Sequence, residues 1–153
     1  MSHRIAIPAF LALFFSTIPA KAQVHLGEPF GLSVGGSVSI VDAGVSVGFD
    51  RLVYDGRCPI GVTCVWEGNA AVRVWGAVPA GAPTFFDLNS HAQFPTEVPF
   101  NGVIIRLLGV HPYPVHPVMV DPGDYRIGMV VVGTAAPLPA GTRTWGAIKA
   151  LYR

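Results

Sequence analysis

The sequence predicts an all-β fold, either an antiparallel β-sandwich or a small Greek-key barrel, built from about seven strands. Three observations support this prediction. Apolar and polar residues alternate with a period of two through most of the chain, which is the pattern of half-buried strands. Glycine (18 residues) and proline (14) are abundant and charged residues make up only 12%, a composition that favours short strands and tight turns. No helical period separates the alternating segments.

Seven segments show the strand pattern, and they cover residues 30–34, 38–41, 45–54, 71–78, 84–88, 103–110 and 125–132. Turn sequences rich in glycine and aspartate follow the first two, at residues 35–36 (GG) and 42–44 (DAG). The fourth ends at Pro79. The sixth, VIIRLLGV, is almost continuously apolar, which predicts a central, buried strand.

Three further segments are predicted as connections. Residues 93–99 form a loop, and residues 111–117 (HPYPVHP) carry three prolines in seven positions, which predicts an extended loop. Asp121-Pro122-Gly123-Asp124 has proline at the second position and glycine at the third, the preference of a type II turn.

The first 22 residues have the layout of a secretory signal peptide. Arg4 precedes an uncharged, apolar run over residues 5–18, and Ala20-Lys21-Ala22 is a small-x-small cleavage site. The apolar run of 14 residues is shorter than the about 20 needed to span a bilayer as a helix. We expect cleavage after Ala22, a β-sandwich domain over residues 23–133, and a linker and C-terminal tail over residues 134–153.

The expected mature chain carries little net charge. Removal of Arg4 and Lys21 leaves eight basic against nine acidic residues, so no basic face is available for nucleic acid. We expect a periplasmic or secreted protein that does not stay inserted in the membrane after signal cleavage.

The two cysteines, Cys58 and Cys64, are predicted to form a disulfide, because an exported chain matures in an oxidising compartment. Closure of this loop removes denatured-state entropy worth about 2 kcal/mol. A redox centre would need the tighter C-x-x-C spacing, and zinc would need more ligands nearby. Both alternatives stay open at this stage, as do two free thiols.

Four residues around the cysteines form the candidate binding surface: Asp55, Arg57, Trp66 and Glu67. Asp55 and Arg57 are expected to belong to one rigid corner with the disulfide loop. Trp66 is expected to pack in the core beside the disulfide, with an exposed aromatic platform as the alternative. The loops of a sandwich are where binding residues usually lie.

The stretch D-x-R-C-P-x-x-V-x-C-V-W-x-G-x-A, over residues 55–70, resembles the signature of a family of small, uncharacterised bacterial exported proteins and lipoproteins, in which the motif usually reads DSRCP…V.CVWAG.A. The resemblance extends over most of residues 30–132. This chain differs at Gly56, at Glu67, where alanine is usual, and in having no lipid-anchor cysteine near the cleavage site. The family implies export but no assigned activity.

No pattern in the chain predicts catalysis. Two G-x-S-x-G strings surround Ser33 and Ser46, but neither is followed by the helical period that a nucleophile elbow requires. His111 and His116, with Asp121, are weak candidates for a metal site, since their spacing on a proline-rich loop lacks an established ligand pattern. We expect no cofactor.

We therefore expect a binding or scaffold module of the cell envelope, whose partner is an unknown protein or envelope ligand. Two other functions stay open. A small outer-membrane-type β-barrel fits the size and composition, although most strands are shorter than the about 9–11 residues that a membrane strand needs. A metal-dependent envelope enzyme would need the histidines to come together.

Overall fold

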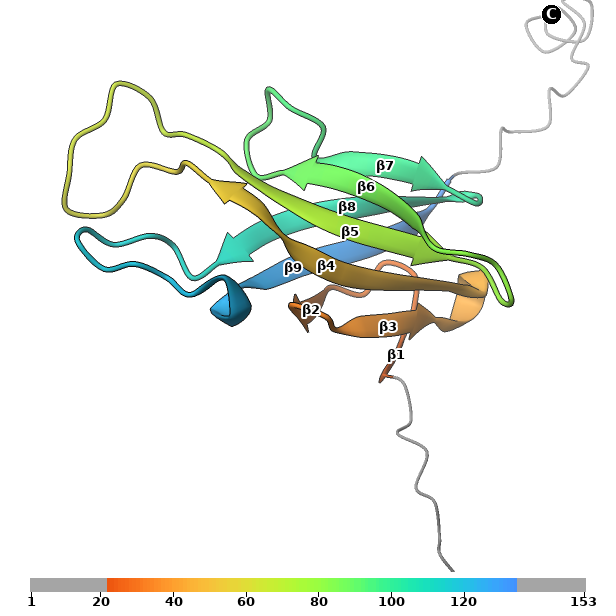
Figure 1. Cartoon of the computed structure of the whole chain (residues 1–153). Coiled ribbons are helices and arrows are strands. Elements are labelled where there is room, and N and C mark those ends of the chain that lie inside the picture. The colour runs from red at the N-terminus through yellow and green to blue at the C-terminus, as the bar shows by residue number, and fades with distance from the viewer. Residues whose placement is uncertain (1–21, 135–153) are drawn as a thin grey trace, which may run out of the picture.

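Two sheets pack face to face in the computed structural model, which describes residues 22–134 (Figure 1). Two short 3-10 helices, Val41–Ala43 and Pro122–Asp124, lie between strands. The strands in chain order are β1 (Ala22–Val24), β2 (Phe30–Ser33), β3 (Ser37–Ile40), β4 (Val45–Asp55), β5 (Ala70–Ala77), β6 (Thr84–Asn89), β7 (Glu97–Phe100), β8 (Val103–His111) and β9 (Arg126–Gly133).

The first sheet has the order β1-β3-β4-β5-β6 and the second the order β2-β9-β8-β7. Every pairing is antiparallel except that of β1 with β3. Each sheet stays open, with two edge strands. The predicted all-β sandwich is confirmed, with nine strands among residues 22–134 in place of about seven.

The core lies between the two sheets. Because successive side chains of a strand point to opposite faces, each strand contributes every second residue to it. In β4, Val45, Val47 and Phe49 are buried, whereas Ser46 and Asp50 are partly exposed. The largest buried side chains come from both sheets: Ile40, Phe49, Leu88, Ile105, Ile127 and Met129.

The structure contains two strands that the sequence prediction omitted, β1 and β7. β1 has only three residues, too few to display a period, and β7 contains Pro99, a residue that argues against a strand. Residues 93–99 were predicted as a loop, but Glu97–Phe100 pairs with β8. Pro99 is tolerated there because β7 is an edge strand.

Two local predictions also need correction. The β8 strand is central, between β9 and β7, but it is buried on one face only, and Leu108 is 54% exposed. Residues 122–124 form a 3-10 helix and not a type II turn. The side chain of Asp121 caps this helix by accepting a hydrogen bond from the Gly123 N–H at 2.8 Å.

The predicted signal peptide, residues 1–22, lies outside the described residues except for Ala22, and the predicted tail, 134–153, lies outside them except for Thr134. Among residues 22–134, no helix has the length and apolar character to cross a membrane.

The end of β4 bends where it leaves the sandwich. Its pairing with β5 shifts register between Phe49 and Arg51 and again between Leu52 and Tyr54. Such bulges turn a strand and redirect its side chains. Beyond them, the last residue of β4, Asp55, lies within hydrogen-bonding distance of Tyr125, which precedes β9 in the other sheet.

Substitution of Phe49 by alanine should lower the free energy of unfolding by about 3–5 kcal/mol, because it empties the centre of the core. Val53→Ala, in the same strand but 45% exposed, should change it by less than about 0.5 kcal/mol. Urea denaturation of both variants measures the difference, and equal losses would contradict this placement of the core.

Candidate binding site at the loop end

Two long loops project from the same end of the sandwich (Figure 1). The disulfide loop, residues 56–69, joins β4 to β5, and the proline-rich loop, residues 112–125, joins β8 to β9. We call the two loops together the loop end. One loop leaves the first sheet and the other leaves the second, so the loop end spans both layers of the fold.

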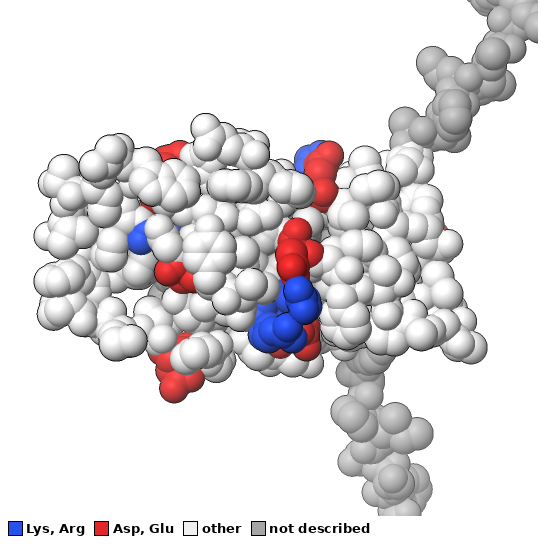
Figure 2. Space-filling model, turned by 45° about the horizontal axis from the view of Figure 1, so that its top comes forward, with Lys and Arg blue, Asp and Glu red and all other residues white. Residues whose placement is uncertain are grey.

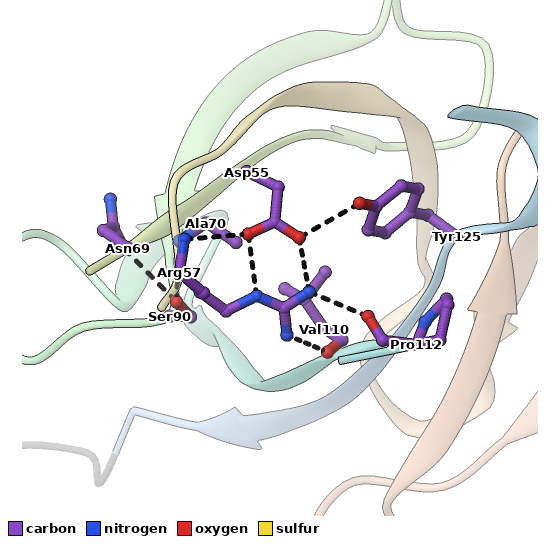
Figure 3. Close-up of polar contacts among 8 residues, drawn as sticks. All are labelled: Asp55, Arg57, Asn69, Ala70, Ser90, Val110, Pro112 and Tyr125. Carbon is purple, nitrogen blue, oxygen red and sulfur yellow. Dashed lines mark hydrogen bonds and ion pairs between the residues drawn. The ribbon is translucent and has the colours of Figure 1, made fainter. Parts of the chain in front are cut away.

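A buried ion pair lies at the base of the loop end (Figure 3). The Arg57 Nε donates to Asp55 Oδ1 at 2.8 Å and Nη2 donates to Oδ2 at 2.6 Å, a bidentate arrangement. The Arg57 backbone N–H donates to the same carboxylate at 3.1 Å. The Asp55 and Arg57 side chains are only 8% and 6% exposed. Both side chains are therefore largely withdrawn from solvent, although Arg57 still lines the hollow between the loops that is described below.

The ion pair connects the two sheets. The Arg57 Nη1 donates to the Val110 carbonyl of β8 at 2.6 Å, and Nη2 donates to the Pro112 carbonyl at 2.8 Å. The Tyr125 hydroxyl donates to Asp55 Oδ2 at 3.0 Å. The Tyr113 ring covers the guanidinium, with its centroid 4.8 Å from Cζ, a cation–π distance. Asp55 and Arg57 thus fix where both loops begin.

These contacts determine which form of Asp55 is stable. Burial alone raises the pKa of a carboxyl. Hydrogen bonds from the Arg57 side chain and backbone, the Arg57 charge and the Tyr125 hydroxyl outweigh burial and hold the pKa of Asp55 below its usual value. Burial and the bond to Asp55 raise the pKa of Tyr125. Both groups therefore keep, near neutral pH, the protonation states that the network requires.

Cys58 and Cys64 form the predicted disulfide, with 5.9 Å between their Cα atoms. The bond closes the tip of the disulfide loop. Behind it, the Cys58 N–H donates to the Glu67 carbonyl at 2.8 Å, which joins the two arms of the loop. The disulfide and this hydrogen bond together hold the two arms of the loop close to each other.

The two loops are hydrogen-bonded to each other near their tips. The Ile60 N–H donates to the Pro114 carbonyl at 3.0 Å, and the His116 N–H donates to the Ile60 carbonyl at 2.9 Å. Ile60 and Val115 form a parallel β-bridge. This pairing could not be predicted from the sequence, because residues 58–66 and 112–120 lack the strand period.

Asn69 connects the end of the disulfide loop to the neighbouring strands through its buried side chain. The sequence analysis did not identify this residue. The residue is 1% exposed, and both polar atoms of its side chain are hydrogen-bonded. The amide Nδ2 donates to the Tyr54 hydroxyl at 3.0 Å and to Asn89 Oδ1 at 2.8 Å. Its Oδ1 accepts from the Ser90 hydroxyl at 3.3 Å and the His91 N–H at 3.1 Å. Figure 3 shows part of this arrangement beside the ion pair.

Gly68 is required by the close approach of the two arms of the disulfide loop. Its φ is +77°, in the region that favours glycine. A Cβ atom there would lie 2.0 Å from the Gly56 carbonyl oxygen and 2.7 Å from the Arg57 Cα. A glycine just before a predicted strand is the one sequence signal that could have indicated this contact.

The tips of the two loops are apolar. Neither residues 58–66 nor residues 112–120 contain Asp, Glu, Lys or Arg. In Figure 2 many charged atoms lie in a band across the middle of the molecule, and a few more lie toward the loop end. Val65 and Met119, 106% and 93% exposed, stand fully in solvent. The other exposed apolar side chains of the loop end are Ile60, Val62, Trp66, Tyr113, Val115 and Val118.

Trp66 lies on this surface and not in the core, which corrects the expectation that it packs against the disulfide. It is 52% exposed. Its indole meets the ring of His91 edge to face at a centroid distance of 5.8 Å, and His91 meets Phe94 in the same way at 6.3 Å. The backbone of the disulfide loop, not the hydrophobic core, therefore determines the position of Trp66.

Glu67 holds His91 in one tautomer. The Nε2 of His91 lies 2.8 Å from Glu67 Oε1, and its Nδ1 accepts the Gln93 N–H at 3.2 Å. Because Nδ1 accepts, Nε2 carries the proton. Both ring nitrogens of His91 are therefore hydrogen-bonded within the protein.

His111 and His116 are exposed on the proline-rich side of the loop end. Within residues 22–134, no group of three or more His, Cys, Asp or Glu side chains could hold a metal ion. Ser33 and Ser46, in the two G-x-S-x-G strings, lie within β2 and β4.

An open hollow of about 580 Å³ lies between the loops and the β6–β7 connection. Its walls include Glu67, His91, Leu108, His111 and Tyr113. A second, shallower hollow lies over the disulfide and is lined by Ile60, Val62, Val65 and Trp66. Together they give the loop end a contoured surface rather than a single deep pocket.

Comparisons with protein-family models, with curated proteins and with solved structures found no match to this chain.

Replacement of Asp55 by asparagine should flatten the acid dependence of stability. Because the pKa of Asp55 is lower in the folded than in the unfolded state, its stabilising effect is complete above an unfolded pKa of about 4. That effect is lost as the pH falls through the folded value. Urea titrations at pH values between 7 and 2 should show that the free energy of unfolding falls less with acidification in Asp55→Asn than in the wild type. Glu97→Gln, in the exposed pair with Arg106, is the control, and identical pH slopes for Asp55→Asn and the wild type would contradict the assignment.

Removal of the disulfide by the double change Cys58→Ser and Cys64→Ser should lower the free energy of unfolding by about 2 kcal/mol, the entropic value for so short a loop. The wild type unfolded in the presence of a reductant should show the same loss. An unchanged urea midpoint in both experiments would contradict the structural role of the bond.

Proposed function

We propose that this chain is an exported binding module that docks on a partner protein through the loop end. The observation that carries the proposal is the set of eight exposed apolar side chains on two loops at one end of the sandwich. Contiguous apolar surface of this kind marks a site of interaction when it occurs on a globular domain.

The framework beneath the apolar side chains supports a binding role. The disulfide, the Asp55–Arg57 ion pair and the bonds between Ile60 and the proline-rich loop hold the surface in one shape before a partner arrives. A surface that is already ordered loses less conformational entropy on binding. Trp66 and Tyr113 are side chain types enriched at the energetic centres of protein interfaces.

The charges around the loop end favour a protein over a lipid surface. The exposed charged side chains within the two loops are all acidic: Glu67, Asp121 and Asp124. An acidic rim repels anionic headgroups, whereas it complements a partner with an apolar centre and basic residues around it. We therefore assign the loop end to a protein partner with a basic rim.

The proposal includes export of the chain and its relation to the family of small bacterial exported proteins. The Cys58–Cys64 bond is typical of proteins that mature in an oxidising compartment, and residues 1–22 have the layout of a signal peptide. The motif over residues 55–70 resembles that of the small bacterial exported proteins described above.

Val65→Asp should abolish capture of the partner, because it places a charge at the most exposed apolar position. The tagged full-length chain, expressed in its own host, is cross-linked in the intact envelope and purified with its partner. Val41→Asp is the matched control, since Val41 is 49% exposed in the 3-10 helix that joins β3 to β4.

The proposal requires a protein that the wild type and Val41→Asp both capture and Val65→Asp does not. Equal capture by all three chains would contradict it. Binding to phosphatidylethanolamine vesicles that Val65→Asp alone loses would also contradict it, since the loop end would then be a membrane contact.

A further inference from the structure

A second candidate site lies on the outer face of the first sheet, toward the hairpin that joins β5 to β6 and away from the loop end (Figure 1). Gly48, Trp75 and Phe85 are direct partners across β4, β5 and β6. Their neighbours in sequence, such as Val47 and Val74, are buried in the core, so this row lies on the opposite face. Phe85 is 51% exposed.

The indole of Trp75 lies over Gly48. A Cβ atom at Gly48 would be 2.2–2.4 Å from Cε2, Cζ2 and Nε1 of the indole. Only glycine leaves room for the ring in this position, and a glycine inside a strand often marks such a close approach. The indole is thereby held against the sheet while Trp75 as a whole stays partly exposed.

These two aromatic side chains line an open hollow of about 540 Å³. Polar side chains of β4, Ser46 and Asp50, lie along it, and the hairpin residues 77–81 and Pro83 close one end. The hollow therefore combines aromatic surface with a hydroxyl and a carboxylate.

The charges beside the hollow are paired. Arg73 forms a bidentate bond with Asp87, at 2.7 and 2.8 Å, and Arg51 pairs with Asp50 at 2.5 Å. Two cations and two anions leave no net charge at this site. A charged ligand would find no opposing charge that is free, which favours a neutral ligand with many hydroxyl groups.

We propose that this hollow binds a neutral, β-1,4-linked pyranose oligosaccharide. Such a sugar has flat C–H faces and a rim of hydroxyls. One C–H face would stack on the indole of Trp75, the next ring would contact Phe85, and the rim hydroxyls would bond to Ser46 and to the carboxylate of Asp50. This site is independent of the protein interface proposed for the loop end.

Isothermal titration calorimetry with chitohexaose and cellohexaose tests the proposal on the purified full-length chain. At least one of the two sugars should bind the wild type, and Trp75→Ala should weaken binding by about tenfold or more. Gly48→Ala should weaken it as well, because the new methyl group displaces the indole and leaves Trp75 in the chain. Circular dichroism shows whether each variant is folded.

Trp66→Ala is the matched control, a tryptophan removed at the opposite end, and it should bind the sugar as the wild type does. The proposal is wrong if neither sugar binds at 10 mM, or if Trp66→Ala loses as much affinity as the folded Trp75 and Gly48 variants. Binding of a decaproline peptide in place of both sugars would also overturn it.

Discussion

The ion pair between Asp55 and Arg57 joins the two sheets at the end where both long loops begin. Removing two charges from water is costly, and the cost is offset only when the remaining donors and acceptors are satisfied. Here the guanidinium makes four hydrogen bonds, to Asp55, Val110 and Pro112, while Tyr125 donates to the carboxylate. In the described part of the chain, no buried side-chain nitrogen or oxygen is left without a partner.

The apolar surface depends on this polar base. Val65, Trp66 and Met119 have too little contact with the core to be positioned by packing. Their positions follow from the backbone, which the disulfide, the bonds between Ile60 and the proline-rich loop, and the buried amide of Asn69 hold in place. Trp75, on the outer face of the first sheet, is positioned differently. Its indole lies in direct contact with Gly48 of the neighbouring strand.

The sequence predicted those parts of the fold that depend on local pattern. Seven strands followed from alternation, and the disulfide followed from the expected compartment. The strand β1 was missed because three residues show no period, and β7 was missed because it contains Pro99. Asp55 and Arg57 were recognised as part of one corner, but their burial depends on Val110 and Tyr125, which are 53 and 70 residues distant in the chain. Trp66 was placed in the core because aromatic character does not tell which side of a loop faces solvent.

The most direct test of this account is amide hydrogen exchange in Arg57→Lys, measured by NMR. Lysine keeps the charge but cannot reach Asp55, Val110 and Pro112 together. The amides of Ile60 and His116, which donate across the two loops, should be protected in the wild type. In the variant they should exchange at least about tenfold faster, while those of β5 and β8 keep their protection. Equal protection of Ile60 and His116 in both proteins would show that the loop end holds its shape without the ion pair.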